Sequence, residues 1–297
     1  MVKQKNNSPQ QAIRINNISY HDVIKNLKTR IYKGDRIALT GANGAGKSTL
    51  LLLIAGVLIP QQGVIEREKT LSISLVADQP LLYPQLTVIE HLQSRAASQT
   101  PALIEHVINL CQLHEVLHMP ASRLSKGYRQ RLSLALARIE APDVLLLDEP
   151  GDGLDQSSHN VLAQVLKDLA EQSCVILCTH QPELIQAYCS RMLVLAEGAI
   201  TQDITLLDLQ PQWNITFNEP VNESSLQQFD SELKITVIDK QHYTIETAGS
   251  FNSSLFIQHC QSLNLALAEI SKLPIDTQLR QRMGGRSYQP NGQGQAS

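Results

Sequence analysis

The sequence has no excess of basic residues and no set of paired cysteines. The first absence argues against a nucleic-acid-binding protein, and the second argues against a disulfide-stabilised secreted protein. The chain carries 25 Lys and Arg against 28 Asp and Glu, a formal net charge of -3, so no broad positive field is available to bind nucleic acid by counterion release. We therefore expect no nucleic-acid partner. The five cysteines include no C-x-x-C pair, a pattern that suits a reducing compartment and indicates buried thiols.

A long hydrophobic run is also missing. The longest, residues 50–59, is far shorter than the roughly 20 apolar residues that cross a bilayer. Residues 1–10 are polar and lack the apolar centre of a signal peptide. We expect a cytoplasmic chain, and a separate spanning subunit if its work involves a membrane.

The length of 297 residues exceeds what one hydrophobic core usually supports, about 250 residues. A hydrophobic fraction of 42% against 18% charged residues indicates a globular chain and not a disordered one. We expect a main domain over residues 1–205 and a small accessory domain over 206–285. The remainder, residues 286–297, is rich in Gly, Gln and Asn and is typical of a disordered tail.

Short apolar runs alternate with segments of helical character in the first two thirds of the chain. This alternation predicts an α/β domain whose largely parallel sheet is covered on both faces. A capping box at Thr87 and Glu90 predicts a helix to about Ala97, and apolar spacing predicts a second helix over residues 102–117. These two helices would form a helical lobe. The predicted strands are residues 37–39, 73–76, 144–147, 175–177 and 192–195.

After Gly198 the pattern changes to alternation of apolar and polar residues, which is typical of half-buried strands. Together with two short helical segments it predicts the order β-α-β-β-α-β, a split βαβ unit and therefore a small α+β domain. The expected strands are residues 213–217, 233–237, 243–245 and 267–270, and the expected helices are residues 224–229 and 253–263.

Residues 41–48 match the pattern G-x4-G-K-[ST], follow the strand that ends at Thr40 and precede an apolar helix. In such a phosphate loop, glycines let the backbone N–H groups curl around a β-phosphate and the helix N-terminus favours negative charge. Lys47 would reach the β and γ oxygens, and Ser48 would ligate Mg²⁺. A simple glycine turn would explain the bend, but not the lysine followed by serine.

Asp148 and Glu149 follow a buried strand at residues 144–147. Ligands of α/β sheets bind at the carboxyl ends of the strands, so Asp148 is expected to hold the metal. Glu149 is expected to orient the attacking water and accept its proton. Acidic residues after a strand are often only solvated loop residues, and it is the pairing with the phosphate loop that favours the catalytic interpretation.

Residues 124–131, Leu-Ser-Lys-Gly-Tyr-Arg-Gln-Arg, lie upstream of these carboxylates and resemble the signature of ABC ATPases. The resemblance covers residues 13 to about 200, with an aromatic, the phosphate loop, a glutamine, the signature, the acidic strand, Gly153-Leu154-Asp155 and a histidine in the family's order. It implies a P-loop NTPase of ABC type with a mixed sheet and a helical lobe, acting as an ATPase with ATP and Mg²⁺.

The resemblance also assigns roles to single residues. Tyr20 would stack on adenine, and the alternative is a packed aromatic at a strand end. Gln79 would touch Mg²⁺ and the attacking water, and His180 would contact the γ-phosphate. The catalytic set is then Glu149, His180 and Gln79, and the metal ligands are Ser48, Gln79 and Asp148. The nucleotide-binding set is Tyr20, Gly41, Ala42, Asn43, Gly44, Ala45, Gly46, Lys47, Ser48, Thr49, Ser125 and Gly127.

In the family, Ser125 and Gly127 of one chain cap the γ-phosphate held by another. The resemblance therefore implies two copies that close head to tail, with Asp155 along their seam. Lys126 and Tyr128 depart from the usual Leu-Ser-Gly-Gly-Gln, and Ser-Lys-Gly resembles the exporter branch with type-two permeases. Gly151 and Asp152 depart too, because a hydroxyl residue commonly follows Pro150 in the family. Residues 274–279 resemble only loosely a C-terminal helix of that branch, and an unrelated accessory domain stays open.

The resemblance implies an ATPase subunit at the inner face of the cell membrane that drives export through a separate permease. An apolar patch at residues 81–84 would receive a permease helix. A soluble ATPase of translation or DNA repair is disfavoured, because the chain has a single phosphate loop and no basic arm. An ATP-driven regulator that transports nothing stays an alternative, and the sequence does not identify a cargo.

Overall fold

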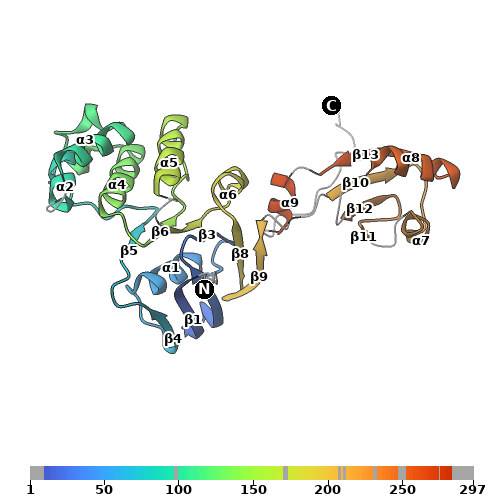
Figure 1. The fold of residues 1–297 in the computed structure, drawn as a ribbon, viewed down its shortest axis with the longest axis horizontal. Coiled ribbons are helices and arrows are strands. Elements are labelled where there is room, and N and C mark those ends of the chain that lie inside the picture. The colour runs from blue at the N-terminus through green and yellow to red at the C-terminus, as the bar shows by residue number, and fades with distance from the viewer. Residues whose placement is uncertain are drawn as a thin grey trace, which may run out of the picture. The chain divides into compact units, whose positions relative to one another are not determined.

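The computed structural model describes residues 10–96, 100–169, 173–206, 209, 212–229, 233–246, 252–273 and 275–282. The chain divides into two compact units, residues 1–206 and 207–297, and each is described by itself (Figure 1). Pro274 and the tail predicted for residues 286–297 lie outside the described residues. No helix in the described part of the chain is both long and apolar enough to cross a membrane.

A six-stranded mixed sheet forms the centre of the first unit. Neighbouring strands are parallel except for the pair formed by residues 191–196 and 199–205, which is antiparallel and joined by a tight turn. The residues of β6 from Val144 to Leu147 are fully buried, which explains why this strand reads as a continuous apolar run. The sheet order is β5 (Ile73–Val76), β6 (Val144–Asp148), β7 (Cys174–Cys178), β3 (Arg36–Thr40), β8 (Arg191–Ala196) and β9 (Ala199–Thr205).

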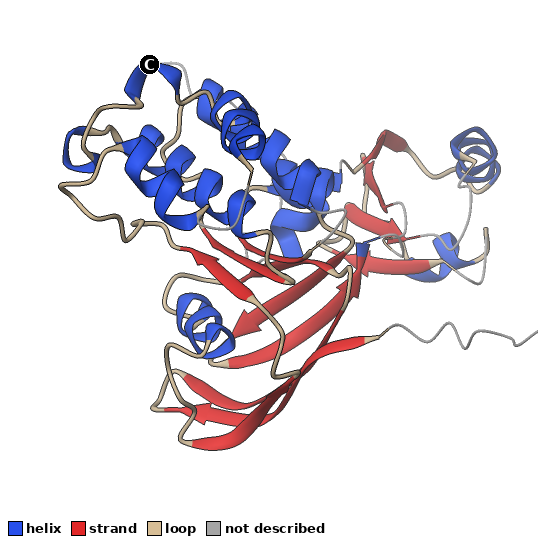
Figure 2. Cartoon of the chain, turned by 60° about the vertical axis from the view of Figure 1, so that its left-hand side comes forward, coloured by secondary structure: helices blue, strands red, loops and turns tan. Residues whose placement is uncertain are grey.

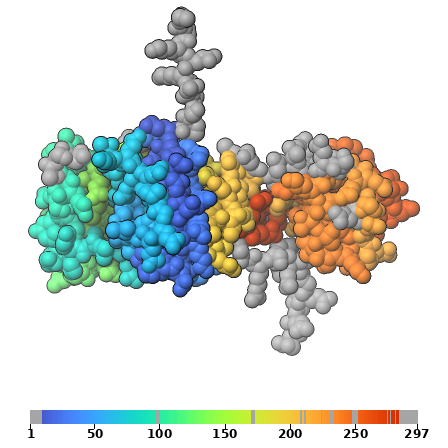
Figure 3. Space-filling model, turned by 90° about the horizontal axis from the view of Figure 1, so that it is seen from below, coloured from blue at the N-terminus to red at the C-terminus, as the bar shows by residue number. Residues whose placement is uncertain are grey.

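A second, three-stranded antiparallel sheet was not predicted from the sequence. It has the order β2 (Ile24–Tyr32), β1 (Gln11–Tyr20), β4 (Gln62–Arg67). Helix α1 (Lys47–Ala55) shares one apolar core with β1, β2 and the central sheet, and Figure 2 shows this single helix between the two sheets. In Figure 3 the blue surface of the N-terminal strands adjoins the light-blue surface around β4.

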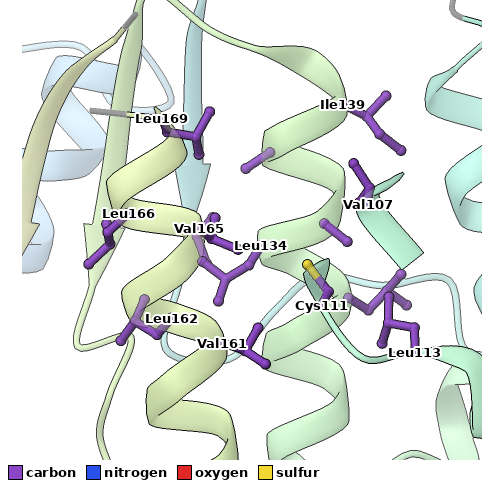
Figure 4. Packing of buried hydrophobic residues seen from close by; sticks show 14 of the residues in the cluster. Val107, Cys111, Leu113, Leu134, Ile139, Val161, Leu162, Val165, Leu166 and Leu169 are labelled. Atoms are coloured by element: carbon purple, nitrogen blue, oxygen red, sulfur yellow. The ribbon is translucent and has the colours of Figure 1, made fainter. Parts of the chain in front are cut away.

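The helical lobe has its own core. It contains α2 (Val88–Arg95), α3 (Pro101–Leu110), α4 (Lys126–Glu140) and α5 (Gln156–Leu169), which bury residues such as Leu134, Val161 and Leu166 against one another (Figure 4). Two short 3₁₀ helices, His114–Val116 and Ala121–Arg123, connect these elements, and α6 (Pro182–Tyr188) follows β7. The capping box of α2 is formed as predicted, with Thr87 accepting from the Glu90 N–H and the Glu90 carboxylate accepting in return.

The helix predicted over residues 102–117 is wrong in its length. It ends at Leu110, and the chain then turns through Gln112, which adopts a positive φ of 52°. A single turn of 3₁₀ helix follows at His114–Val116. The apolar spacing continues through this turn because Leu113 and Val116 are buried in the same core. Helix α2 ends at Arg95, and the predicted end at Ala97 lies outside the described residues.

The second unit has the element order that the sequence pattern predicts. Its four-stranded sheet is antiparallel throughout, with the order β11 (Lys234–Val237), β12 (His242–Glu246), β10 (Gln212–Phe217), β13 (Leu267–Lys272). Helices α7 (Glu223–Gln227) and α8 (Ser253–Ser262) occupy the two crossover positions, and α9 (Ile275–Arg282) follows the last strand. Phe217, Tyr243 and Phe256 are fully buried in its core.

Candidate nucleotide site

The phosphate loop runs from the end of β3 to the start of α1, and its glycines are required by geometry. A Cβ at Gly41 would lie 2.1 Å from the backbone oxygen of Leu195 in β8, so no side chain fits there. Gly44 and Gly46 adopt positive φ angles of 80° and 103°, a region that glycine enters at little cost. The loop backbone is thereby bent tightly into the N-terminus of α1.

The Lys47 side chain folds back over this loop. Its Nζ donates hydrogen bonds to the carbonyl oxygens of Gly41, at 2.9 Å, and Ala42, at 3.1 Å. The Leu50 N–H donates to the carbonyl of the N-cap residue Gly46 at 2.9 Å, and the N–H groups at the start of a helix before this bond have no partner within the helix. A cation and the N–H groups of a helix N-terminus therefore lie in the same loop, which is the chemistry that binds phosphate.

An open cavity of about 510 Å³ lies in front of the loop. The two carboxylates that follow β6 border the same cavity as the phosphate loop, which brings together two motifs about 100 residues apart in the sequence. The lining residues are Val23, Asn43, Gly44, Gly46, Lys47, Ser48, Thr49, Asp148 and Glu149.

Glu149 stands in an unusual local conformation. Its φ is 45°, which is uncommon for a residue with a side chain, and its N–H is fixed to the Cys178 carbonyl of β7 at 2.9 Å. Its Oε2 lies 3.1 Å from Nδ1 of His180, which follows β7. Because an ionised carboxylate only accepts, the proton of this hydrogen bond belongs to the imidazole.

The protonation of Glu149 reflects opposing influences. Burial raises the pKa of this carboxyl above its ordinary value, while the nearby His180 and Lys47 lower it and Asp148 raises it further. The net direction is upward. A partly buried carboxylate with a raised pKa, adjacent to a phosphate-binding loop, has the properties expected of a general base.

The residues around the cavity fit a nucleotide with Mg²⁺. Gly44 borders the cavity and has no atom within 4 Å of where a Cβ would stand, so the loop leaves room for a phosphate, and Lys47 supplies an ammonium group. The Ser48 hydroxyl and the Asp148 carboxylate line the cavity together, and hard oxygen donors of this kind are the ligands that Mg²⁺ prefers.

Tyr20 and Gln79, which were predicted as site residues, lie outside the phosphate-loop cavity. Tyr20, the last residue of β1, packs against the core of β1, β2 and α1 and stands edge-on to His21, with ring centroids 4.4 Å apart. Gln79 lines a different cavity of about 440 Å³, together with Lys126 and Arg129. Neither is among the residues that border the phosphate-loop cavity, so their roles toward nucleotide stay predictions.

The signature segment forms the start of α4. Ser125 is the N-cap, and its Oγ accepts from the Tyr128 N–H at 3.3 Å. A Cβ at Gly127 would lie 2.9 Å from the Ser158 Oγ of α5, so this glycine permits close packing of the two helices. Neither Ser125 nor Gly127 borders the phosphate-loop cavity of its own chain.

Arg131 is a residue that the sequence analysis missed. Its side chain is almost fully buried beneath the signature, where its Nε donates to Ser158 Oγ at 3.0 Å. Its guanidinium also lies 3.8 Å from the Asp155 carboxylate and 5.1 Å from the centre of the Tyr128 ring. The spacing of Tyr128 and Arg131 on one helix face was the available signal, and it indicates that Arg131 braces the signature against the Asp155 loop.

Comparison with known proteins supports one family. The model of the ABC transporter family matches residues 24–152. The SkfA peptide export ATP-binding protein SkfE of Bacillus subtilis is 31% identical over 221 residues, which cover 68% of this chain and 92% of SkfE. NatA of the same organism, an ABC transporter ATP-binding protein, is 30% identical, and the match covers 60% of this chain and 79% of NatA. A putative ABC transporter ATP-binding protein of Streptococcus mutans is 28% identical, and this chain spans only 45% of its length.

Solved structures give the same result for the fold. An ATP-binding subunit of an ABC transporter is 26% identical with a TM-score of 0.60, covering 67% of this chain and 91% of the other. A nucleotide-free ATP-binding cassette from an ABC transporter is 20% identical with a TM-score of 0.57, and the match covers 66% of this chain and 92% of the other. At this identity it supports the fold alone. The phosphate loop, the acidic strand and these relatives together show that the chain belongs to the ABC transporter family, as an ATP-binding subunit with ATPase activity.

Proposed function

We propose that the chain hydrolyses ATP with Glu149 as the general base. The single observation that carries this proposal is the position of the Glu149 carboxylate, which borders the phosphate-loop cavity and lies within hydrogen-bond distance of His180. Glu149 would orient the attacking water and accept its proton. His180 would hold the carboxylate in that direction.

The remaining roles follow from the donors around the cavity. Lys47 would exchange its two carbonyl partners for the β and γ oxygens of ATP, and the phosphate-loop N–H groups would hold the same phosphates. Ser48 and Asp148 would hold Mg²⁺, with Gln79 as a further candidate. Mg²⁺, when bound, neutralises charge that develops on the phosphates.

Glu149→Gln tests the assignment of the base. The amide keeps the shape of the side chain but cannot accept the proton, so turnover should fall at least about 100-fold while ATP affinity is retained. Glu66→Gln, which removes a half-exposed carboxylate in the other sheet, should leave both unchanged. Lys47→Ala should instead weaken ATP binding itself. Normal hydrolysis by the Glu149 variant would overturn this proposal.

We further propose that two copies complete each ATP site head to tail. The support is that Ser125 and Gly127 stand at a helix N-terminus but away from the phosphate-loop cavity of their own chain. A second copy would present its ATP to them, with Asp155 near the seam. The Glu149→Gln chain should therefore form a dimer when Mg²⁺ and ATP are added. A chain that binds ATP and stays monomeric would contradict the two-copy site.

We propose that residues 81–84, the docking loop, receive a transmembrane permease at the inner face of the cell membrane. Leu81 is 99% and Tyr83 63% exposed, so two large apolar side chains lie close together at the surface, which is typical of an interaction site. The loop is braced, because Tyr83 N–H donates to His91 Nε2 at 3.0 Å and Ser122 N–H donates to the Pro84 carbonyl at 3.0 Å. Such bracing presents the apolar side chains in a fixed arrangement.

Export through a type-two permease is the finer proposal. Its support is the Ser-Lys-Gly signature, together with the printed name of SkfE as a peptide export protein. Tyr83→Ala should reduce copurification with the permease and permease-stimulated ATPase activity, whereas Ile59→Ala, at another exposed apolar residue, should not. If Tyr83→Ala changed neither, this placement of the permease would be wrong. A transport assay on the whole complex separates an exporter from a regulator that moves no cargo.

A further inference from the structure

Lys126, the unusual cation of the signature, has a partner in its own chain. Its Nζ lies 3.3 Å from Oδ1 of Asp78. That oxygen is shielded from solvent and has no hydrogen-bond partner, so the contact is an ion pair by distance without hydrogen-bond geometry. The two side chains as a whole are 47% and 42% exposed. A single ion pair between side chains that are exposed to this extent contributes little to stability, and it can therefore be exchanged at low cost.

This ion pair joins segments that carry the proposed chemistry. Val76 of β5 pairs with Leu147 of β6, so Asp78 follows β5 at the same sheet edge where Asp148 and Glu149 follow β6. Lys126 is the first residue of α4. A Cβ at Gly153 would stand 3.6 Å from the same Nζ, so one ammonium group lies between the signature, the segment before Gln79 and the Gly153 turn.

The space beside the ion pair is suited to an anion. A cavity of about 440 Å³ is lined by Asp78, Gln79, Pro80, Lys126 and Arg129. Two cations face one carboxylate there, so the cavity keeps an excess positive charge after the ion pair is counted. It adjoins Ser125 and Gly127, which the proposed function assigns to the terminal phosphate of the second copy's ATP.

We infer that Asp78 holds Lys126 in the separate chain and releases it to that phosphate when two copies close. This inference rests on the two-copy site proposed above. Lys126 is then a phosphate-binding residue supplied across the seam, and Asp78 is a positioning residue that acts through it. The exchange is favourable because a charge-assisted contact to phosphate is stronger than a half-exposed pair without hydrogen-bond geometry. Asp78 thus sets how readily ATP closes the dimer.

The experiment measures ATP-driven dimerisation of the full chain in the Glu149→Gln background, by sedimentation at increasing concentrations of Mg²⁺ and ATP. Lys126→Met should raise the ATP concentration for half-maximal dimer about tenfold, through loss of the phosphate contact. Asp78→Asn should lower it about threefold, because Lys126 no longer has a competing carboxylate. In the Lys126→Met background, Asp78→Asn should have no effect. Lys126→Met should also weaken the dependence of dimerisation on salt.

Lys33 and Glu68 form a matched control, since this lysine–glutamate pair is 44% and 50% exposed with its charges 3.7 Å apart. Lys33 precedes β3, at the end opposite the phosphate loop, so Lys33→Met and Glu68→Gln should leave dimerisation unchanged.

Three results would overturn the inference. In the first, Asp78→Asn and Lys126→Met weaken dimerisation equally, which means that the ion pair only braces the fold. In the second, Asp78→Asn strengthens dimerisation even without the lysine. In the third, the Glu149→Gln chain binds ATP without dimerising, which refutes the two-copy site and the exchange with it. The first two leave the two-copy site intact, so the failures are distinguishable.

Discussion

The contact between Gly127 and Ser158 allows a sharp test of how the signature helix is seated on α5. A Cβ at Gly127 would lie 2.9 Å from Ser158 Oγ but 3.9 Å from Ser158 Cβ, so a single hydroxyl oxygen stands in the way. Ser158 is only 1% exposed, and that oxygen accepts from Arg131 Nε at 3.0 Å. Any movement that makes room for the new methyl group therefore breaks a buried, charged hydrogen bond.

The expected magnitudes follow from these contacts. Replacing glycine by alanine inside a helix normally gains about 0.5–1 kcal/mol, whereas a hydrogen bond to a charged group contributes about 1.5–3 kcal/mol. Gly127→Ala should therefore lower the free energy of unfolding by about 1–2 kcal/mol, and Ser158→Ala by about 2 kcal/mol. In the Ser158→Ala background the obstacle is gone, and Gly127→Ala should become neutral or stabilising by up to about 1 kcal/mol.

The assay is urea unfolding of the full chain. The only tryptophan, Trp213, lies in the second unit, so its fluorescence follows that unit, and far-UV circular dichroism follows the whole chain. The transition that shifts when Mg²⁺ and ATP are added belongs to the first unit. Ser157→Ala, at the exposed neighbouring residue, should leave the cost of Gly127→Ala unchanged. Equal destabilisation by Gly127→Ala with and without the Ser158 hydroxyl would refute this reasoning.

Three other predictions concern the phosphate loop, the base and the thiols. Gly41→Ala should lower the free energy of unfolding by about 3 kcal/mol or more and abolish ATP binding, because its Cβ would meet a backbone oxygen at 2.1 Å. Gly44→Ala, with φ 80° but open space around it, should lower it by only about 1–2 kcal/mol. Equal losses in urea unfolding would contradict this expectation. Because burial raises the pKa of Glu149, kcat should fall with decreasing pH at a pH above the usual carboxyl value of about 4.3. An acid limb at or below that value would exclude Glu149 as the base. Burial also raises the pKa of Cys111 to about 12, so a thiolate-directed reagent at pH 8 should label this thiol only after unfolding. Rapid labelling of the folded chain would contradict the burial of Cys111 in the core of the helical lobe.

The parts of the fold that the sequence predicts well are those governed by local pattern. Central strands such as β6 and β7 are buried on both faces and therefore appear as uninterrupted apolar runs. The phosphate loop is equally visible, because its glycines and lysine stand at fixed spacing between a strand and a helix. The mixed α/β fold of ABC type predicted from these motifs is confirmed by the structure and by its relatives.

The parts that were missed depend on contacts distant in the sequence. The antiparallel sheet was not predicted, because β1 contains register shifts and a positive φ at Asn17 that interrupt its alternation. The third helix was predicted too long, because Leu113 and Val116 keep the helical spacing while the backbone turns at Gln112. Nor could the sequence reveal the partners of buried or paired cations, such as Ser158 for Arg131, since these lie 27 residues apart and on different helices.

Three of the groups that are proposed to act on ATP have partners within the chain. Lys47 is bonded to two carbonyls of its own loop, Ser125 to the Tyr128 N–H, and Glu149 to His180. These partners keep the polar groups satisfied, because a buried and unpaired charge would be costly. In the proposed mechanism, Lys47 and Ser125 give up these partners when they bind phosphate, whereas His180 keeps its contact with Glu149. Part of the binding energy would therefore go into rearranging the phosphate loop and the signature. On this proposal ATP binding would be tied to movement of the phosphate loop and the signature, which is the property that a subunit driving a membrane partner requires.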